Sequence, residues 1–248
     1  MAINLKISKS WNELNARQLK KIAWGFFSQK GEDLDVLIYF ALIDLRPFQL
    51  LKHLKAVRVL RYVPLSTLKK YYSWVYKTTN LTTFIPSINL NNKIIYSPGD
   101  RLNNITIHEF SVALDLYLGW KKTKDIDYLF YLTAVLFREL DPSKLRVPFV
   151  KDQLEIRYKE VSRIDPKTVL AVCLSFEGCL YHITNKFPSV FPIDPKSKSK
   201  STPSNSGFGH LILFSAGKKF GNHNETKNTN VYTFLTDFSE QLKKSPYA

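Results

Sequence analysis

Histidines are the side chains of this sequence best suited to metal binding or acid–base catalysis. The chain contains His53, His108, His182, His210 and His223, and none of them is three or four residues from another. Histidines that bind one metal from a single helix are usually that close, so these five would have to converge from distant parts of the chain. We therefore expect no metal site and no catalytic histidine.

Two pairs of aspartates and one glycine-bounded segment are the other candidates for chemistry. Asp33 with Asp35, and Asp125 with Asp127, could hold Mg²⁺ between their carboxylates. Both pairs lie where helices are expected to begin, and the positive end of the helix dipole explains a carboxylate there. The segment 217–221, GKKFG, lacks the pattern of a phosphate-binding loop. The sequence therefore predicts no catalytic residue, no cofactor and no enzyme.

The cysteines and the apolar runs bear on the compartment of the protein. Cys173 and Cys179 lie on one predicted helix but on different faces, which favours two reduced thiols over a disulfide. The N-terminal segment turns polar too early for a signal peptide, and no apolar run approaches the roughly 18 residues of a transmembrane helix. We expect a cytoplasmic protein without membrane contact.

An excess of positive charge is the strongest indication of a binding partner. The net charge is +15, and residues 45–99 contain nine basic residues and no acidic one. Such a field attracts nucleic acid, anionic lipid or an acidic protein, although the solvated face of a basic protein would also carry it. The candidate interaction surface, called the basic patch below, consists of Arg46, Lys52, Lys55, Arg58, Arg61, Lys69, Lys70 and Lys77.

Aromatic residues are interleaved with the lysines at one end of the basic patch. They are Tyr71, Tyr72, Trp74 and Tyr76. This arrangement can bind a single strand of nucleic acid by stacking on its bases, but aromatics at helical spacing more often fill a core. We expect these side chains to be buried and nucleic-acid binding to be weak.

Helices are the elements expected to carry the basic patch. A capping-box pattern, S-x-x-E at 10–13, predicts the start of a first helix. The apolar run within 33–45 fits a buried strand or a buried helix, and its length and flanks favour the helix. A third helix is expected over 47–57 and a fourth over 66–77. The apolar stripe of the third helix, expected to face the core, is Leu50, Leu51, Leu54 and Val57.

After residue 83 the helical pattern gives way to a segment with the features of β-strands. Two extended segments around Asn91-Asn92 predict a β-hairpin near 84–97. Thr106 and Glu109 have the T-x-x-E spacing of a capping box, and Asp125 can cap the next helix. Asp165-Pro166 supplies an N-cap and a first-turn proline for a long apolar helix.

A polar segment rich in lysine and serine separates the predicted domains. Residues 196–207, KSKSKSTPSNSG, have the composition of a flexible linker. We therefore expect a helical domain over 1–193, a linker over 194–207 and a C-terminal helical segment over 208–248. The predicted fold class is mainly α, a multi-helix globular protein with one small β-hairpin.

Two motifs resemble a group of phage and prophage proteins from Bacteroidetes-type hosts. The first is the segment 96–110, YSPGDRLNNITIHEF, and the second is 129–138, LFYLTAVLFR. The opening SWNEL at 10–14 and the segment 220–235 are also similar. The resemblance implies a role like that of a tail-assembly chaperone, and it attaches no catalytic residue to any position of this chain.

These observations predict a non-enzymatic phage structural or assembly protein. It would bind other virion proteins through helical surfaces, in the cytoplasm of a bacterial host or as part of the virion. The alternative is a nucleic-acid-binding module that uses the basic stretch 46–93. The sequence leaves the oligomeric state open.

Overall fold

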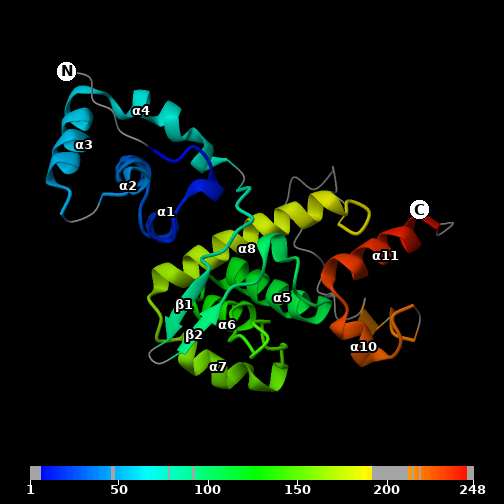
Figure 1. The fold of residues 1–248 in the computed structure, drawn as a ribbon. Coiled ribbons are helices and arrows are strands. Elements are labelled where there is room, and N and C mark those ends of the chain that lie inside the picture. Colours follow the sequence, from blue (N-terminus) through cyan, green and yellow to red (C-terminus); the bar gives the residue numbers. More distant parts are fainter. Residues whose placement is uncertain are drawn as a thin grey trace. The chain divides into compact units, whose positions relative to one another are not determined.

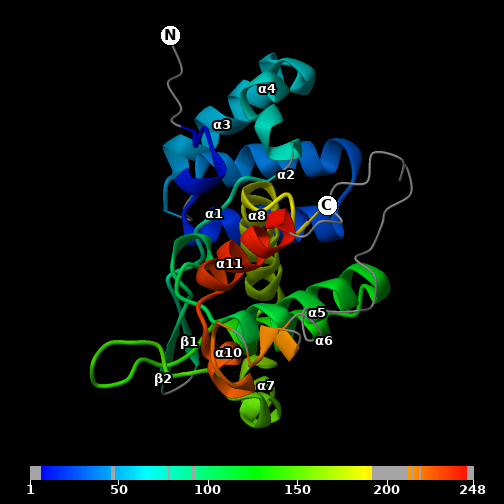
Figure 2. The same cartoon turned by 90° about the vertical axis from the view of Figure 1, so that its right-hand side faces the viewer.

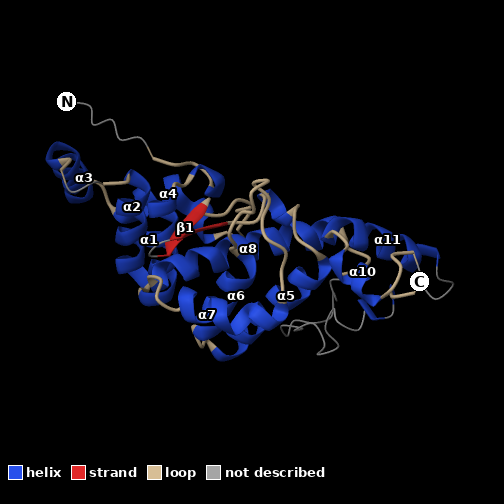
Figure 3. Ribbon diagram, turned by 60° about the horizontal axis from the view of Figure 1, so that its bottom comes forward, coloured by secondary structure: helices blue, strands red, loops and turns tan. Residues whose placement is uncertain are grey.

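Helices dominate the structure, a computed structural model drawn in Figures 1 and 3. It describes residues 7–45, 48–77, 79–90, 93–191, 212–213, 215–217 and 219–244. Within these residues the β-structure is a two-stranded antiparallel sheet and three isolated bridges. The predicted fold class, mainly α with one small hairpin, is confirmed.

The chain is divided into two compact units. The first comprises Met1–Leu81 and Asp165–Gly178, and the second Thr82–Ile164 and Cys179–Ala248. The long helix α8, Pro166–Lys186, therefore contributes residues to both units. The predicted linker over 194–207 lies outside the described residues, so a domain boundary at that point stays a prediction.

Helix pairs form the first unit. Its elements are η1 (Trp11–Glu13), α1 (Ala16–Ser28), α2 (Gly31–Ile43), α3 (Leu50–Tyr62), α4 (Leu65–Tyr72) and η2 (Ser73–Tyr76), where η denotes a 3-10 helix. Helix α1 packs against α2, which also contacts α4, and Figure 2 shows α1 and α2 side by side. The run 33–45 is therefore a helix, as its length indicated.

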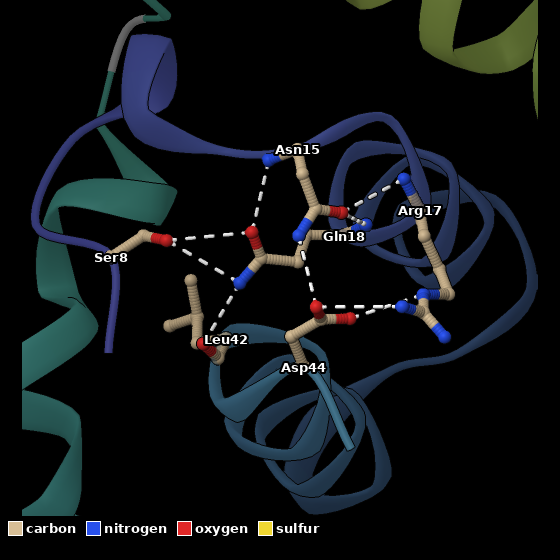
Figure 4. Close-up of polar contacts among 6 residues, drawn as sticks. All are labelled: Ser8, Asn15, Arg17, Gln18, Leu42 and Asp44. Atoms are coloured by element: carbon tan, nitrogen blue, oxygen red, sulfur yellow. Dashed lines mark hydrogen bonds and ion pairs between the residues drawn. The ribbon is translucent and has the colours of Figure 1, made fainter. Parts of the chain in front are cut away.

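The start of α1 shows that the predicted capping box was placed too early. Ser10 precedes the short helix η1 and makes no capping hydrogen bond with its side chain. Asn15 is the N-cap instead, and its side chain accepts hydrogen bonds from the backbone N–H groups of Arg17 and Gln18, both at 3.0 Å. The Gln18 side chain accepts from Asn15 N–H at 2.9 Å, which completes the box (Figure 4).

This cap also attaches the start of α1 to the end of α2 (Figure 4). The buried Gln18 amide donates to the Leu42 carbonyl at 2.9 Å. Asp44, left-handed with φ of 52°, accepts from the Asn15 amide at 3.0 Å and pairs with Arg17 Nε at 3.1 Å. The pairing of α1 with α2 thus combines apolar packing with directed polar contacts.

The second unit is built around α5. Its elements are β1 (Ser87–Leu90), β2 (Lys93–Tyr96), η3 (Asp100–Leu102), α5 (Ile107–Thr123), α6 (Asp127–Leu136), η4 (Lys151–Gln153), α7 (Leu154–Val161), α10 (His223–Asn228) and α11 (Val231–Lys244). Helix α5 packs against α6, α10 and α11, and α6 also packs against α7. The cap predicted at Asp165 is present, because Asp165 accepts from Lys167 N–H at 3.0 Å. Asp125 accepts from Asp127 N–H at 3.0 Å, but the N-cap of α6 is Ile126, which makes no side-chain capping bond.

The predicted hairpin is confirmed, and a third segment extends it. Strands β1 and β2 are antiparallel, with Ser87 opposite Tyr96 and Leu90 opposite Lys93. Tyr96 also exchanges backbone hydrogen bonds with Arg138, at 2.7 and 3.1 Å. The chain leaving α6 therefore lies beside β2, and this brings Arg138 into the interior of the second unit.

Glu109 differs from its expected role as the second half of a capping box. Thr106 accepts from Glu109 N–H at 3.2 Å, as the spacing predicted. The Glu109 carboxylate, 1% exposed, pairs with Arg138 Nη2 and Arg146 Nη2, each at 2.6 Å. A buried carboxylate is stable only when it is paired and hydrogen-bonded, so these two charges decide where it points.

Both arginines depend on this carboxylate for their counter-charge. Burial lowers the pKa of Arg138 to about 10, whereas the Glu109 carboxylate raises it and the neighbouring Arg146 lowers it further. Arg146 Nη2 also donates to the Leu136 carbonyl at 2.8 Å. The cluster joins α5 to the segments on either side of residue 140.

Replacing Glu109 with glutamine should lower the free energy of unfolding by roughly 3–5 kcal/mol, because two buried guanidinium groups lose their counter-charge. Urea or thermal unfolding measures the effect. The control Glu240→Gln alters an exposed carboxylate of the same unit and should stay within about 0.5 kcal/mol. A loss below about 1 kcal/mol for Glu109→Gln would contradict the proposed dependence.

Candidate interaction surface

Helix α3 carries its apolar stripe on the outside, which contradicts the expectation that this stripe faces the core. The exposed fractions are 71% for Leu50, 76% for Leu51, 66% for Leu54 and 54% for Val57. The residue that α3 buries completely is Ala56, whose carbonyl accepts a hydrogen bond from the Tyr39 hydroxyl at 3.1 Å. The spacing correctly predicted that these residues share one face of a helix. The prediction that this face points into the core was wrong.

The exposed side chains form one continuous face. Leu50, Leu54 and Val57 are separated by four and three residues, so they lie above one another along the helix. Leu51 is beside them, and Phe48, just before the helix begins, is 96% exposed. Figure 1 shows α3 as an outer helix of the first unit. We call Leu50, Leu51, Leu54 and Val57 the α3 face.

Positive charge surrounds the α3 face. Lys55, Arg58 and Arg61 of the basic patch are exposed on this helix, and Lys52 is half-buried. The Arg58 guanidinium lies 6.0 Å from the ring centre of Tyr62. Within the part of the chain that the structure describes, these four cations form no ion pair with a carboxylate. They are therefore available to an acidic partner.

The remaining members of the basic patch lie elsewhere. Lys70 on α4 and Lys77 after η2 are exposed, and Arg46 lies outside the described residues. Lys69 has a structural role, because it pairs with Asp35 at 3.1 Å and lies 4.6 Å from the ring centre of Tyr76. The structure thus separates α3, with four of the predicted cations, from a second group on the segment that follows.

Asp35 is the centre of a polar cluster that joins α2 to α4 and η2. The Tyr76 hydroxyl donates to Asp35 at 2.5 Å, beside the ion pair with Lys69. Burial and the nearby Asp35 carboxylate raise the pKa of both Tyr72 and Tyr76, that of Tyr72 to about 12. Both hydroxyls are therefore neutral around pH 7. The cluster fixes α2 against α4 and η2, the elements that precede and follow α3.

The aromatic cluster is buried in part only. Tyr72 is 1% exposed, and Trp74 is half-buried with its ring edge-to-face against Trp11 at 5.5 Å. Tyr71, expected in the core, is 65% exposed, whereas Leu68 and Tyr72 are the residues that α4 buries. Tyr71 and Tyr76, which is 39% exposed with its hydroxyl bonded to Asp35, are much less than a stacking platform for several bases.

The other described residues offer no stronger candidate for a functional site. No three His, Cys, Asp or Glu side chains among them gather as metal ligands would. No described helix is long and apolar enough to cross a membrane. Cys173 and Cys179 are buried and are not joined by a disulfide, as the sequence predicted.

Comparisons with models of protein families, with curated proteins and with solved structures found no match to this chain. The resemblance to phage proteins therefore stays a prediction from the sequence motifs. The α3 face is the most informative functional feature, and its exposure was not predicted by any sequence pattern.

Leu54→Ala should change the free energy of unfolding by less than about 0.5 kcal/mol, because an exposed leucine buries little surface on folding. The matched substitution Leu42→Ala, at a position that is 2% exposed in α2, should cost roughly 2–5 kcal/mol. Chemical unfolding of the two variants tests the assignment. Equal losses would mean that α3 packs with its apolar stripe inward.

Proposed function

We propose that this chain is a non-enzymatic phage assembly protein that holds another virion protein on the α3 face. The observation that carries the proposal is the exposure of four large aliphatic side chains, each more than half accessible, on one helix. Removing such a side chain from water contributes roughly 1.5–3 kcal/mol. Soluble proteins seldom leave a contiguous apolar surface of this kind uncovered unless a partner binds there.

The proposed mechanism is passive holding by a preformed surface. The Asp35 cluster fixes α4 against α2, and the Tyr39 hydroxyl attaches α3 to α2 through the Ala56 carbonyl. A partner segment bound on α3 would be kept from aggregating before the particle forms, or would be fixed within the particle. The motif resemblance supports the phage setting and the chaperone-like role.

Nucleic-acid binding is the second candidate function. It is favoured by the acid-free stretch 45–99 and by the exposed Tyr71 next to Lys70. The α3 face argues against it as the main function, because aliphatic side chains neither neutralise phosphates nor stack on bases.

Particle assembly in the host tests the first candidate. Deleting the gene should abolish infectious particles, and the wild-type gene should restore them. We expect Leu51→Gln/Leu54→Gln to fail, since the α3 face loses its apolar character while the fold is retained. Ile156→Gln is the matched control, because Ile156 is an aliphatic residue 64% exposed on α7. Full assembly with the double variant, or failure with the control, would contradict the proposal.

A filter-binding titration tests the second candidate. We expect weak association with single-stranded DNA and RNA at about 0.15 M salt, where screening acts over roughly 8 Å. If nucleic acid were the partner, affinity would fall steeply with salt and Tyr71→Ala would lose roughly 1–3 kcal/mol of binding free energy. Tight association at this salt concentration would replace the first candidate with the second.

A further inference from the structure

We infer that the occupant of the α3 face is an amphipathic helix with apolar residues on one side and acidic residues along its flanks. This inference rests on the proposed function and specifies the chemistry of the partner. It follows from two observations on the same helix, the shape of the apolar surface and the sign of the charges beside it.

The shape of the α3 face suits a second helix. A helix presents a convex surface, so a small molecule would find no enclosure there, whereas another helix packs ridges into grooves along its length. Leu50, Leu54 and Val57 form one such ridge, and Leu51 begins the neighbouring row. A partner with apolar side chains repeating every three and four residues would cover this surface.

The charges beside the face specify an acidic partner. Lys55, Arg58 and Arg61 are exposed around the apolar side chains, and within the described residues none of them has a carboxylate partner. Guanidinium groups bind carboxylates through paired hydrogen bonds. In helix–helix contacts, ion pairs that flank the apolar seam determine which helices associate. Asp and Glu on the flanks of the bound helix would complement them.

The same charges argue against a second copy of this chain as the occupant. Two α3 helices facing one another would bring together Lys55, Arg58 and Arg61 from both copies, and the acid-free segment 45–99 has no carboxylate to separate them. Like charges facing each other across an interface cost binding free energy. An acidic helix avoids this repulsion and covers the same aliphatic side chains.

Selection from a displayed library of randomised helical peptides, with the full-length chain as the target, tests the inference. Peptides that also bind Leu51→Gln/Leu54→Gln are removed. We expect the retained sequences to repeat apolar residues every three and four positions and to be enriched in Asp and Glu. The inference would be overturned if the retained sequences were not enriched in Asp and Glu. It would also be overturned if no peptide bound the wild type better than Leu51→Gln/Leu54→Gln.

Charge reversal provides the matched control. In Arg58→Glu/Arg61→Glu the aliphatic side chains are unchanged, so the selected acidic peptides should bind about tenfold more weakly. A new selection against this variant should retain Lys and Arg in place of Asp and Glu. Thermal unfolding verifies that the variant is folded, and Lys55→Glu serves as the second variant if it is not. Unchanged affinity and unchanged peptide charge would exclude a role for the cations.

Sedimentation separates a second copy of this chain from an acidic helix as the occupant of the α3 face. Dimerisation of the wild type in sedimentation, lost in Leu51→Gln/Leu54→Gln, would assign the face to a second copy and overturn the inference. If these variants abolish particles but selection yields no acidic helices, the proposed function stands and the inference fails. If selection yields acidic helices but the variants still assemble particles, the inference stands and the proposed function fails.

Discussion

The second unit depends on one buried carboxylate. Glu109 enters the interior from the first turn of α5 and pairs with two guanidinium groups from segments that follow α6. Arg138 is also paired through its backbone with Tyr96, so this ion cluster and the hairpin constrain the same stretch of chain. In a low-dielectric interior an uncompensated charge is far more costly than an exposed one, which makes the geometry around Glu109 intolerant of change.

Polar contacts between helices supplement the apolar packing of the first unit. Gln18 connects the start of α1 to the last turn of α2, and Asp35 connects α2 to Lys69 and Tyr76. The Tyr39 hydroxyl bond to the Ala56 carbonyl connects α3 to α2, and the α3 face contributes little buried surface to the unit. A stable scaffold can therefore present an apolar helix face without depending on that face for its own folding.

The α3 face joins two features that are usually interpreted separately. Its aliphatic side chains supply a non-directional driving force for association, and the surrounding Lys55, Arg58 and Arg61 restrict which surfaces can approach. Positive charge alone fits nucleic acid, anionic lipid, an acidic protein or the solvated face of a basic protein. The exposed leucines favour a protein, because their burial requires an apolar partner surface.

The sequence by itself determined that the chain is mainly helical and where the hairpin lies. The caps at Thr106 and Asp165 and the hairpin depend on neighbours a few positions away, so local spacing was sufficient. Only the tertiary structure decided which side of α3 faces solvent and where the Glu109 carboxylate is directed. A repeating apolar pattern has the same form whether the protein core or a partner covers it. Likewise, the partners of Glu109 are 29 and 37 residues away in sequence, and the folded chain alone brings them to it.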